Sequence, residues 1–247
     1  MLTGPASHTR EETHHARIKN VGDVRRIDLG FFVRPADEAG APHPRVEPVY
    51  GYLVRRPEGL LLFDTGMGAH PDVDAHYQPT RRPLPEALQQ AGVSTNDVTM
   101  IVNCHLHFDH CGGNPLFTGR PILVQDKELA AARKTTDYTL PELIDFAGAH
   151  YLEISGETEL WPGVWIIPTP GHTDGHQSVA VLRADGTVVL AGQARDDATT
   201  FGRDLLAHQS GHDIPYPKWV ERLIELDPRA IVFAHDAAVW MPGERKD

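Results

Sequence analysis

The sequence His105-Leu106-His107-Phe108-Asp109-His110, or HLHFDH, places four side chains with metal-binding chemistry within six positions. The apolar run Met100-Ile101-Val102 precedes it and Gly112-Gly113 follows, which predicts a buried strand, the cluster and then a sharp turn. Imidazole and carboxylate groups are ligands for zinc and its first-row neighbours. A loop at the strand end can direct the first two histidines to one ion and the Asp109–His110 pair to a second. That arrangement is typical of a two-metal hydrolytic site.

The composition is typical of a globular protein and excludes little else. With 247 residues, 40% of them hydrophobic and 23% charged, the chain is long enough for one large domain or two small ones. We interpret residues 1–20 as a polar N-terminal arm and residues 21–247 as a single domain. The formal net charge of -11 disfavours nucleic acid as a partner, because phosphate binding requires a basic surface.

The sequence has no feature of a membrane or secreted protein. No run approaches the roughly 18 apolar residues of a membrane span, and the polar N-terminus lacks the apolar core of a signal peptide. We therefore expect a cytoplasmic protein with no membrane partner. Cys104 and Cys111 flank the HLHFDH cluster, and we expect both to be reduced thiols rather than a disulfide.

The periodicity of apolar residues predicts two strand-rich halves, each closed by helices. The expected strands are Val24–Val33, Val49–Arg55, Leu60–Phe63, Met100–Val102, Ile122–Val124, Tyr151–Ile154, Val164–Ile167, Ser178–Leu182, Val188–Ala191 and Ile231–Phe233. The expected helices are Pro85–Ala91, Asp126–Lys134, Leu140–Ala147 and Tyr216–Leu226. Arg34–Pro48 and Met67–Pro83 are predicted to be long irregular loops. This pattern predicts a sandwich of two sheets with helices outside.

Polar residues also follow the other predicted strands. Asp64-Thr65-Gly66 ends one strand, and a carboxylate there is placed to hydrogen-bond a metal-bound imidazole. The loop Gly171-His172-Thr173-Asp174-Gly175-His176 follows a second strand, Ala191-Gly192-Gln193 a third and His235 the last. Each alone is better explained by turn capping or packing. Four strand ends carrying polar residues, beside a dense HxHxDH cluster, favour a shared site.

The order DTG, HxHxDH, GHTxGH, a small-residue turn and a late AHD resembles the metallo-β-lactamase superfamily over about residues 24–240. Within that superfamily the sequence resembles the N-acyl homoserine lactone lactonases, through LLFDTGM at 61–67, Val124-Gln125 with Glu128, and GHTDGHQS at 171–178. The resemblance implies an α/β fold, a four-layer αββα sandwich. It also implies two divalent metal ions, zinc first, with Mn, Co and Fe as alternatives.

The resemblance assigns most of the polar residues to two metal positions. It implies that His105, His107 and His172 hold the first metal, and that Asp109, His110 and His235 hold the second. Asp64 is implied to support a ligand from behind. His176 lies outside this ligand set, and we interpret it as a residue that shapes the loop or orients a ligand.

The chain departs from the family at two positions. Gln193 stands where the family usually has an Asp that bridges both metals, and a neutral amide cannot bridge two cations as an anion does. Asp196, next to Asp197, stands where the lactonases carry a substrate-binding Tyr. Three outcomes are open: a weak second metal, a replacement ligand from one of these aspartates, or ligation of one ion by Gln193. We favour a binuclear site with Gln193 as a terminal ligand.

The implied function is hydrolysis of a lactone or ester by metal-bound hydroxide, with quorum quenching as the biological role. Asp109, with Asp196 as a second candidate, is expected to carry the proton to the leaving alkoxide. The alternatives are a thioester or secondary-metabolite carbonyl hydrolase resembling glyoxalase II, and a non-hydrolytic metal or redox protein. The expected partner is a small-molecule lactone or ester, and a homodimer is left open. Five aromatic residues suit either an apolar acyl tail or ordinary packing: Phe32, Tyr77, Tyr138, Phe146 and Phe201.

Overall fold

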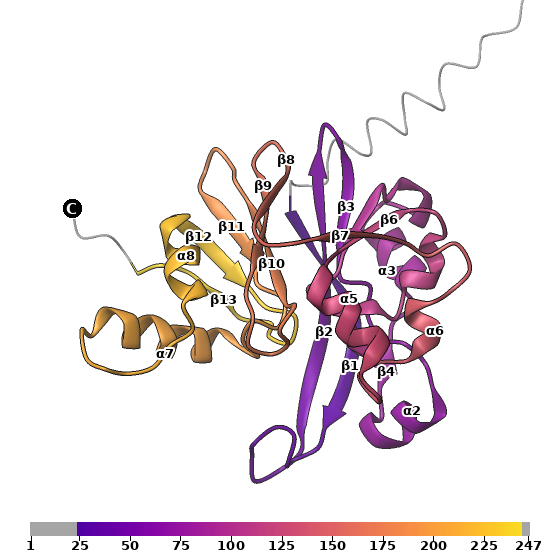
Figure 1. Ribbon diagram of the computed structural model, residues 1–247, viewed down its shortest axis with the longest axis horizontal. Coiled ribbons are helices and arrows are strands. Elements are labelled where there is room, and N and C mark those ends of the chain that lie inside the picture. Colours follow the sequence, from indigo (N-terminus) through magenta and orange to yellow (C-terminus); the bar gives the residue numbers. More distant parts are fainter. Residues whose placement is uncertain (1–23, 244–247) are drawn as a thin grey trace, which may run out of the picture.

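Two β-sheets pack face to face, and helices cover both outer faces (Figure 1). The computed structural model describes residues 24–243, so the predicted polar arm over residues 1–20 lies outside the described residues. The predicted four-layer αββα sandwich is confirmed. A sheet that buries both faces needs an apolar partner on each side, and this layering supplies one.

The first sheet has seven strands in the order β4-β1-β2-β3-β5-β6-β7 within the described residues. Its strands are β1 Val24–Arg34, β2 Arg45–Arg56, β3 Gly59–Phe63, β4 Thr80–Arg81, β5 Met100–Val102, β6 Pro121–Gln125 and β7 His150–Ile154. Strands β3, β5, β6 and β7 run parallel to one another, and the pairings of β1 with β4, β1 with β2 and β2 with β3 are antiparallel. The helices of this half are α2 Pro71–Tyr77, α3 Leu84–Gln90, α4 Phe108–Cys111, α5 Asp126–Lys134 and α6 Pro141–Ile144, with short 3-10 turns at Thr95–Asp97 and Asn114–Phe117.

The second sheet has six strands in the order β13-β12-β11-β10-β9-β8 within residues 24–243. These are β8 Thr158–Trp161, β9 Val164–Pro168, β10 Gln177–Val181, β11 Thr187–Leu190, β12 Pro228–Val232 and β13 Val239–Trp240. Strands β11 and β12 are parallel, and the other pairings are antiparallel. Helices α7 Ala198–Gln209 and α8 Trp219–Glu225 pack on its outer face.

Three apolar layers stabilise the sandwich. The middle layer lies between the sheets and contains Phe63 and Val102 from the first sheet and Val179 and Leu190 from the second. One outer layer joins the first sheet to α3, α5 and α6, and the other joins the second sheet to α7 and α8. Because burial removes these side chains from water, each fully buried Leu, Val or Phe contributes roughly 1.5–3 kcal/mol.

The structure corrects the predicted loops. Arg34–Pro48 is not one long loop, because β2 begins at Arg45 and pairs with β1 in the register Phe32↔Glu47. Met67–Pro83 is not irregular throughout, because it contains α2 and β4. Strands β8 and β13 and helix α7 were not predicted. Residues Glu47 and Pro48 belong to β2 because cross-strand pairing outweighs their low strand propensity. Helix α7 buries too narrow an apolar face to give a helical pattern in the sequence.

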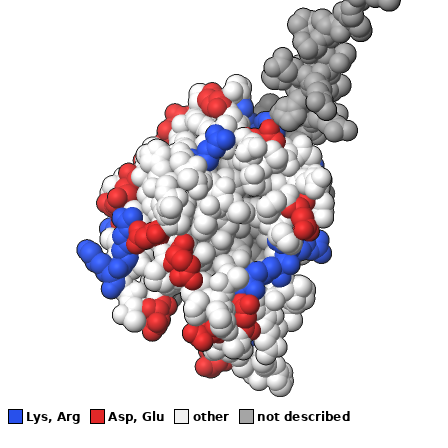
Figure 2. All heavy atoms as spheres, turned by 90° about the vertical axis from the view of Figure 1, so that its right-hand side faces the viewer, with Lys and Arg blue, Asp and Glu red and all other residues white. Residues whose placement is uncertain are grey.

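One face of the molecule carries side chains of both charge signs (Figure 2). On the face turned to the viewer in Figure 2, Asp and Glu side chains are interspersed with Lys and Arg. None of the helices within residues 24–243 is both long and apolar enough to cross a membrane. The polar residues that the sequence predicts to form a shared site lie in the segments that follow β3, β5, β9, β11 and β12.

Candidate metal centre

The HLHFDH sequence forms a loop and a short helix directly after β5. His105 and His107 lie in the loop, and α4 carries Asp109 and His110. Close packing holds α4 against the turn that follows β3: the backbone N–H of Gly112 donates to Gly66 O at 2.7 Å. A Cβ at residue 112 would lie 1.9 Å from the backbone nitrogen of Gly68, so only glycine allows this approach.

His105, His107 and His172 form the first group of donors. His172 comes from the loop after β9, and its Nε2 lies 3.1 Å from Nδ1 of His107. One ligand atom from each of the three side chains lies within 4.8 Å of the others. Nε2 of His105 is buried and has no hydrogen-bond partner. A buried ring nitrogen without a partner is costly unless it binds a ligand, so this group fits a metal ion.

Asp109, His110 and His235 form the second group, and Gln193 joins it. Nε2 of His110 lies 3.2 Å from Oδ2 of Asp109, 3.2 Å from Nε2 of His235 and 3.2 Å from Oε1 of Gln193. Nε2 of His235 lies 3.3 Å from the same carboxylate oxygen. These four atoms come from the ends of β5, β11 and β12.

The outer nitrogen of each histidine in the second group already has an acceptor. Nδ1 of His110 donates to Oδ2 of Asp64 at 3.0 Å, and Nδ1 of His235 donates to the carbonyl oxygen of Pro48 at 2.9 Å. In the neutral rings both Nε2 atoms therefore carry lone pairs and face two oxygen acceptors. Four electron-pair donors directed at one point fit a cation. The donor set of nitrogens and oxygens suits zinc and its neighbours.

Asp64, which directly follows β3, lies behind this group and connects its own turn to the segment that follows β5. Its Oδ1 accepts a hydrogen bond from the backbone N–H of Cys104 at 2.8 Å, while its Oδ2 accepts from His110. Asp64 has φ 60°, a left-handed conformation that is uncommon outside glycine and costs of order 1–3 kcal/mol. The strain is compensated by hydrogen bonds that aim the carboxylate at both partners.

The histidines of the two groups differ in their protonation. Burial lowers the pKa of His107 to about 4 and of His172 to about 3, and it lowers the pKa of His105 well below the ordinary value. These rings are neutral at pH 7 and ready to bind a metal. For His110, burial also acts to lower the pKa, but the neighbouring Cys104, Asp109 and Asp64 outweigh it and raise the pKa well above its ordinary value. A proton therefore competes with a metal in the second group.

A tight turn brings Gln193 to the second group. Gly192 has φ 57°, and a Cβ there would lie 2.4 Å from Cβ of Cys104, so the turn requires glycine. The backbone N–H of Gln193 donates to Nε2 of His176 at 3.0 Å, and Nδ1 of His176 donates to Oγ1 of Thr169 at 2.8 Å. His176 thus holds the turn and keeps both of its ring nitrogens occupied.

The two aspartates after this turn point elsewhere. Oδ2 of Asp196 accepts from Arg34 at 3.2 Å and from Arg45 at 3.0 Å, and its Oδ1 accepts from Nε2 of Gln193 at 3.3 Å. Oδ1 of Asp197 caps helix α7 by accepting from the backbone N–H of Thr200 at 2.6 Å. Neither belongs to the donor groups found among the described residues.

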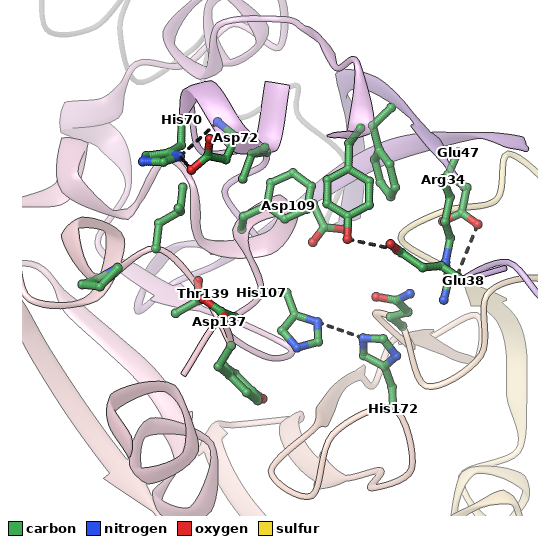
Figure 3. Close-up of a pocket in the computed structure, with 18 of the residues that line it drawn as sticks. Arg34, Glu38, Glu47, His70, Asp72, His107, Asp109, Asp137, Thr139 and His172 are labelled. Atoms are coloured by element: carbon green, nitrogen blue, oxygen red, sulfur yellow. Dashed lines mark hydrogen bonds and ion pairs between the residues drawn. The ribbon is translucent and has the colours of Figure 1, made fainter. Parts of the chain in front are cut away.

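A cavity of about 690 Å³ opens over both donor groups. Figure 3 shows the rings of His107 and His172 next to one another with their nitrogens facing, and Arg34 and Glu47 together on another wall. The aromatic and apolar side chains that line it are Phe32, Val73, Tyr77, Phe108, Tyr138 and Leu140, and polar residues such as Glu38, His70, Asp72 and Asp137 also line it. Of the five aromatic residues considered for an acyl tail, Phe32, Tyr77 and Tyr138 line the cavity. Phe146 and Phe201 pack in the two outer apolar layers instead.

Two buried residues whose roles the sequence did not suggest support the histidines. Glu128 on α5 accepts from the backbone N–H of Leu106 at 2.8 Å and from Oγ1 of Thr173 at 2.7 Å, so it ties the HLHFDH loop to the His172 loop. The Cys104 sulfur lies 3.1 Å from Nδ1 of His105, whose N–H it accepts. Both cysteines are free thiols, as predicted. In the sequence Glu128 stood out only as part of the family resemblance, which did not indicate this contact.

Comparison with known proteins places this chain in a known superfamily. Residues 44–235 match the Metallo-beta-lactamase superfamily. The chain is 31% identical over 205 residues to an N-acyl homoserine lactonase of a Bacillus species, covering 76% of this chain and 81% of the relative. It is 28% identical over 255 residues to the N-acyl homoserine lactonase AiiB of Agrobacterium fabrum, covering 89% and 92%.

A solved structure shows the same similarity in three dimensions. The structure of an N-acyl homoserine lactone hydrolase, with N-hexanoyl-L-homoserine bound at its catalytic metal center, aligns with a TM-score of 0.71 and 28% identity. The alignment covers 88% of this chain and 94% of the other.

Proposed function

This chain belongs to the metallo-beta-lactamase superfamily, and we propose that it is a metal-dependent hydrolase that opens lactones of the N-acyl homoserine type. One observation carries the proposal: two groups of ring nitrogens and carboxylate oxygens converge at the base of a cavity with an aromatic wall. Curated relatives named N-acyl homoserine lactonase support the substrate class. We include residues 21–247 in one catalytic domain, because the donors come from both sheets.

The proposed site holds two divalent ions. His105, His107 and His172 would hold the first; Asp109, His110 and His235, with the amide oxygen of Gln193, would hold the second. Zinc is the first candidate, since nitrogen and carboxylate donors suit it, with Mn, Co and Fe as alternatives. When bound, such ions polarise a carbonyl oxygen and lower the pKa of water to near neutrality.

The protein's own groups would then position the substrate and move a proton. Asp109 belongs to the second donor group and also lines the cavity. Burial acts to raise the pKa of Asp109, but His110 and His235 outweigh it and hold the pKa well below its ordinary value. Asp109 is therefore ionised. It can accept the proton of the attacking water and return it to the leaving alkoxide when the ester bond breaks. A proton-carrying role for Asp196 remains a prediction.

The cavity wall would hold the acyl chain. The Tyr77 ring stacks on Phe108 with centroids 5.0 Å apart, and Phe32 packs edge-on against both. These rings stand beside the HLHFDH loop, so an apolar chain bound against them would leave its lactone carbonyl over the donor groups. Excluding water from this wall strengthens the electrostatic interactions inside the site.

The experiment is a substrate panel assayed with protein reconstituted with Zn, Mn, Co or Fe. The panel contains N-acyl homoserine lactones of several chain lengths, simple esters and acyl thioesters. We expect the lactones to give the highest kcat/KM. A higher kcat/KM for thioesters would favour the glyoxalase II-like alternative. Bound iron together with no hydrolysis of any member would favour the non-hydrolytic metal or redox alternative.

A further inference from the structure

Five side chains beside the second donor group form one hydrogen-bonded network: Arg34, Arg45, Glu47, Gln193 and Asp196. It begins in the first sheet, where Arg34 at the end of β1 pairs across the hairpin with Arg45 at the start of β2. It ends in the second sheet, at the turn after β11. Hydrogen bonds between the two sheets thus reach Gln193, the one amide among the proposed donors.

The amide of Gln193 has two orientations of nearly equal shape, and its neighbours decide between them. A carboxylate only accepts hydrogen bonds, so Oδ1 of Asp196 requires the NH₂ group of Gln193 to face it, at 3.3 Å. The amide oxygen then faces Nε2 of His110 at 3.2 Å and points into the second donor group. With the amide reversed, an NH₂ group would occupy that position, and an amide nitrogen does not ligate a metal.

Asp196 is itself held from behind. Its Oδ2 accepts from both guanidinium groups, at 3.2 Å from Arg34 and 3.0 Å from Arg45. Glu47 is 1% exposed and accepts from Nε of Arg45 at 2.8 Å and from Arg34 at 3.4 Å, which balances the two positive charges. Charge-assisted hydrogen bonds to two cations fix the carboxylate, with Oδ2 on the arginines and Oδ1 facing Gln193.

We propose that Asp196 is a positioning residue that acts through Gln193: held by Arg34 and Arg45, it orients the amide so that its oxygen serves the second metal position. The proposal rests on the proposed function, because it assumes that this position binds a metal. Gln193 can serve as a ligand because its hydrogen bond to Asp196 fixes the direction of its amide oxygen. The charge of Asp196 alone does not have this effect.

Substitution of Asp196 by Asn and by Ala separates direction from charge. In Asp196→Asn the side-chain oxygen must stay with the two arginines, so the new NH₂ group faces Gln193 and forces its amide to reverse. In Asp196→Ala no group faces the amide, and both of its orientations are open. We therefore expect the nominally conservative Asn variant to impair the second metal position more than Ala does.

The readout is the dissociation constant of each Zn²⁺ ion, measured by titrating metal-free protein in competition with a chelating dye. We expect Asp196→Asn to raise the second Kd by roughly 10- to 100-fold, the usual effect of losing a group that orients a ligand, and Asp196→Ala to raise it less. The first Kd should stay within about twofold. Asp204→Asn is the matched control: it removes a carboxylate from another arginine, Arg195, and should change neither Kd.

A second background tests that the effect passes through Gln193. In Gln193→Asp there is no amide to orient, so adding Asp196→Asn should not raise the Kd of the second Zn²⁺ ion. The proposal would be overturned if Asp196→Asn and Asp196→Ala weakened the second Zn²⁺ equally, or if Asp196→Asn weakened it as much in the Gln193→Asp background as in wild type. Those results are expected if Asp196 is itself a ligand or acts only through its charge. An unchanged second Kd in Asp196→Asn would also overturn it.

Two other outcomes test the proposed function instead. Wild-type protein that binds a single ion would contradict the two-metal site, and two bound ions without hydrolysis would contradict only the proposed reaction.

Discussion

Asp64 and His110 are 46 positions apart in the sequence, yet Oδ2 of Asp64 accepts a hydrogen bond from Nδ1 of His110 at 3.0 Å inside the protein. Both side chains are at most 1% exposed. In the neutral ring this bond leaves Nε2 of His110 free of hydrogen and directed at the second metal position. A carboxylate behind a histidine ligand fixes both the ring and its tautomer.

Asp64→Asn should weaken the second metal position while leaving the first intact. An Asn can present either an oxygen or an NH₂ group to the ring, so the tautomer is no longer determined. We expect roughly 10- to 100-fold weaker binding of one Zn²⁺ ion, measured as metal per protein after dialysis against a graded chelator. Asp72→Asn is the control, because Asp72 lines the cavity but lies outside the donor groups. Two ions retained equally by both variants would contradict the role of Asp64.

His107→Ala and Asp109→Ala should each reduce kcat/KM for lactones by more than about 100-fold. Losing a ligand costs more than losing the group that orients it, which sets this lower bound. Circular dichroism should show an unchanged fold, because neither side chain belongs to an apolar layer. Asp109→Asn separates its two roles, since an amide can still offer an oxygen but cannot carry the proton. Full turnover by either alanine variant would rule out the proposed reaction.

Acidification should release the two metals in order. The pKa of His110 is raised, so at pH values below it a proton must leave before a metal binds, and affinity falls about tenfold per pH unit. The pKa values of His107 and His172 are lowered to about 4 and about 3, so the first position competes with protons only near those values. Lowering the pH from 8 to 5 should therefore release the second ion first. Metal analysis after equilibration at each pH measures this, and simultaneous release would contradict it.

Gly192→Ala should destabilise the protein by about 1–3 kcal/mol and weaken the second metal position. The residue has φ 57°, and the added Cβ would lie 2.4 Å from Cβ of Cys104, so the turn that carries Gln193 must move. Gly202→Ala in α7 is the matched control, because nothing lies within 4 Å of its added Cβ. Alanine in that helix should stabilise the protein by roughly 0.5–1 kcal/mol. Thermal unfolding of both variants tests the contrast.

The sequence predicted most of the strands, because buried strands give continuous or alternating apolar runs that are visible locally. Met100–Val102 and Ile231–Phe233 were predicted within a few residues of β5 and β12. It did not predict α7, which has only two buried side chains, Phe201 and Ala207. It also placed the start of β2 too late, because the pairing of Arg45 with Arg34 is a property of the hairpin rather than of either residue.

The proposed donors could be selected from the sequence and its family resemblance, since His105 to His110 form a dense motif and the other proposed donors lie just after predicted strands. The tertiary structure decided how these donors are supported. Glu128 and His176 contact ligand-bearing loops that lie 22 and 17 positions away from them in the sequence. The proposed orientation of the Gln193 amide depends on Asp196. The position of the Asp196 carboxylate depends in turn on Arg34 and Arg45, which lie 162 and 151 positions away. Ligand chemistry belongs to the residue type and is therefore readable in sequence, whereas the direction of a hydrogen bond depends on which distant groups the folded chain brings within hydrogen-bonding distance.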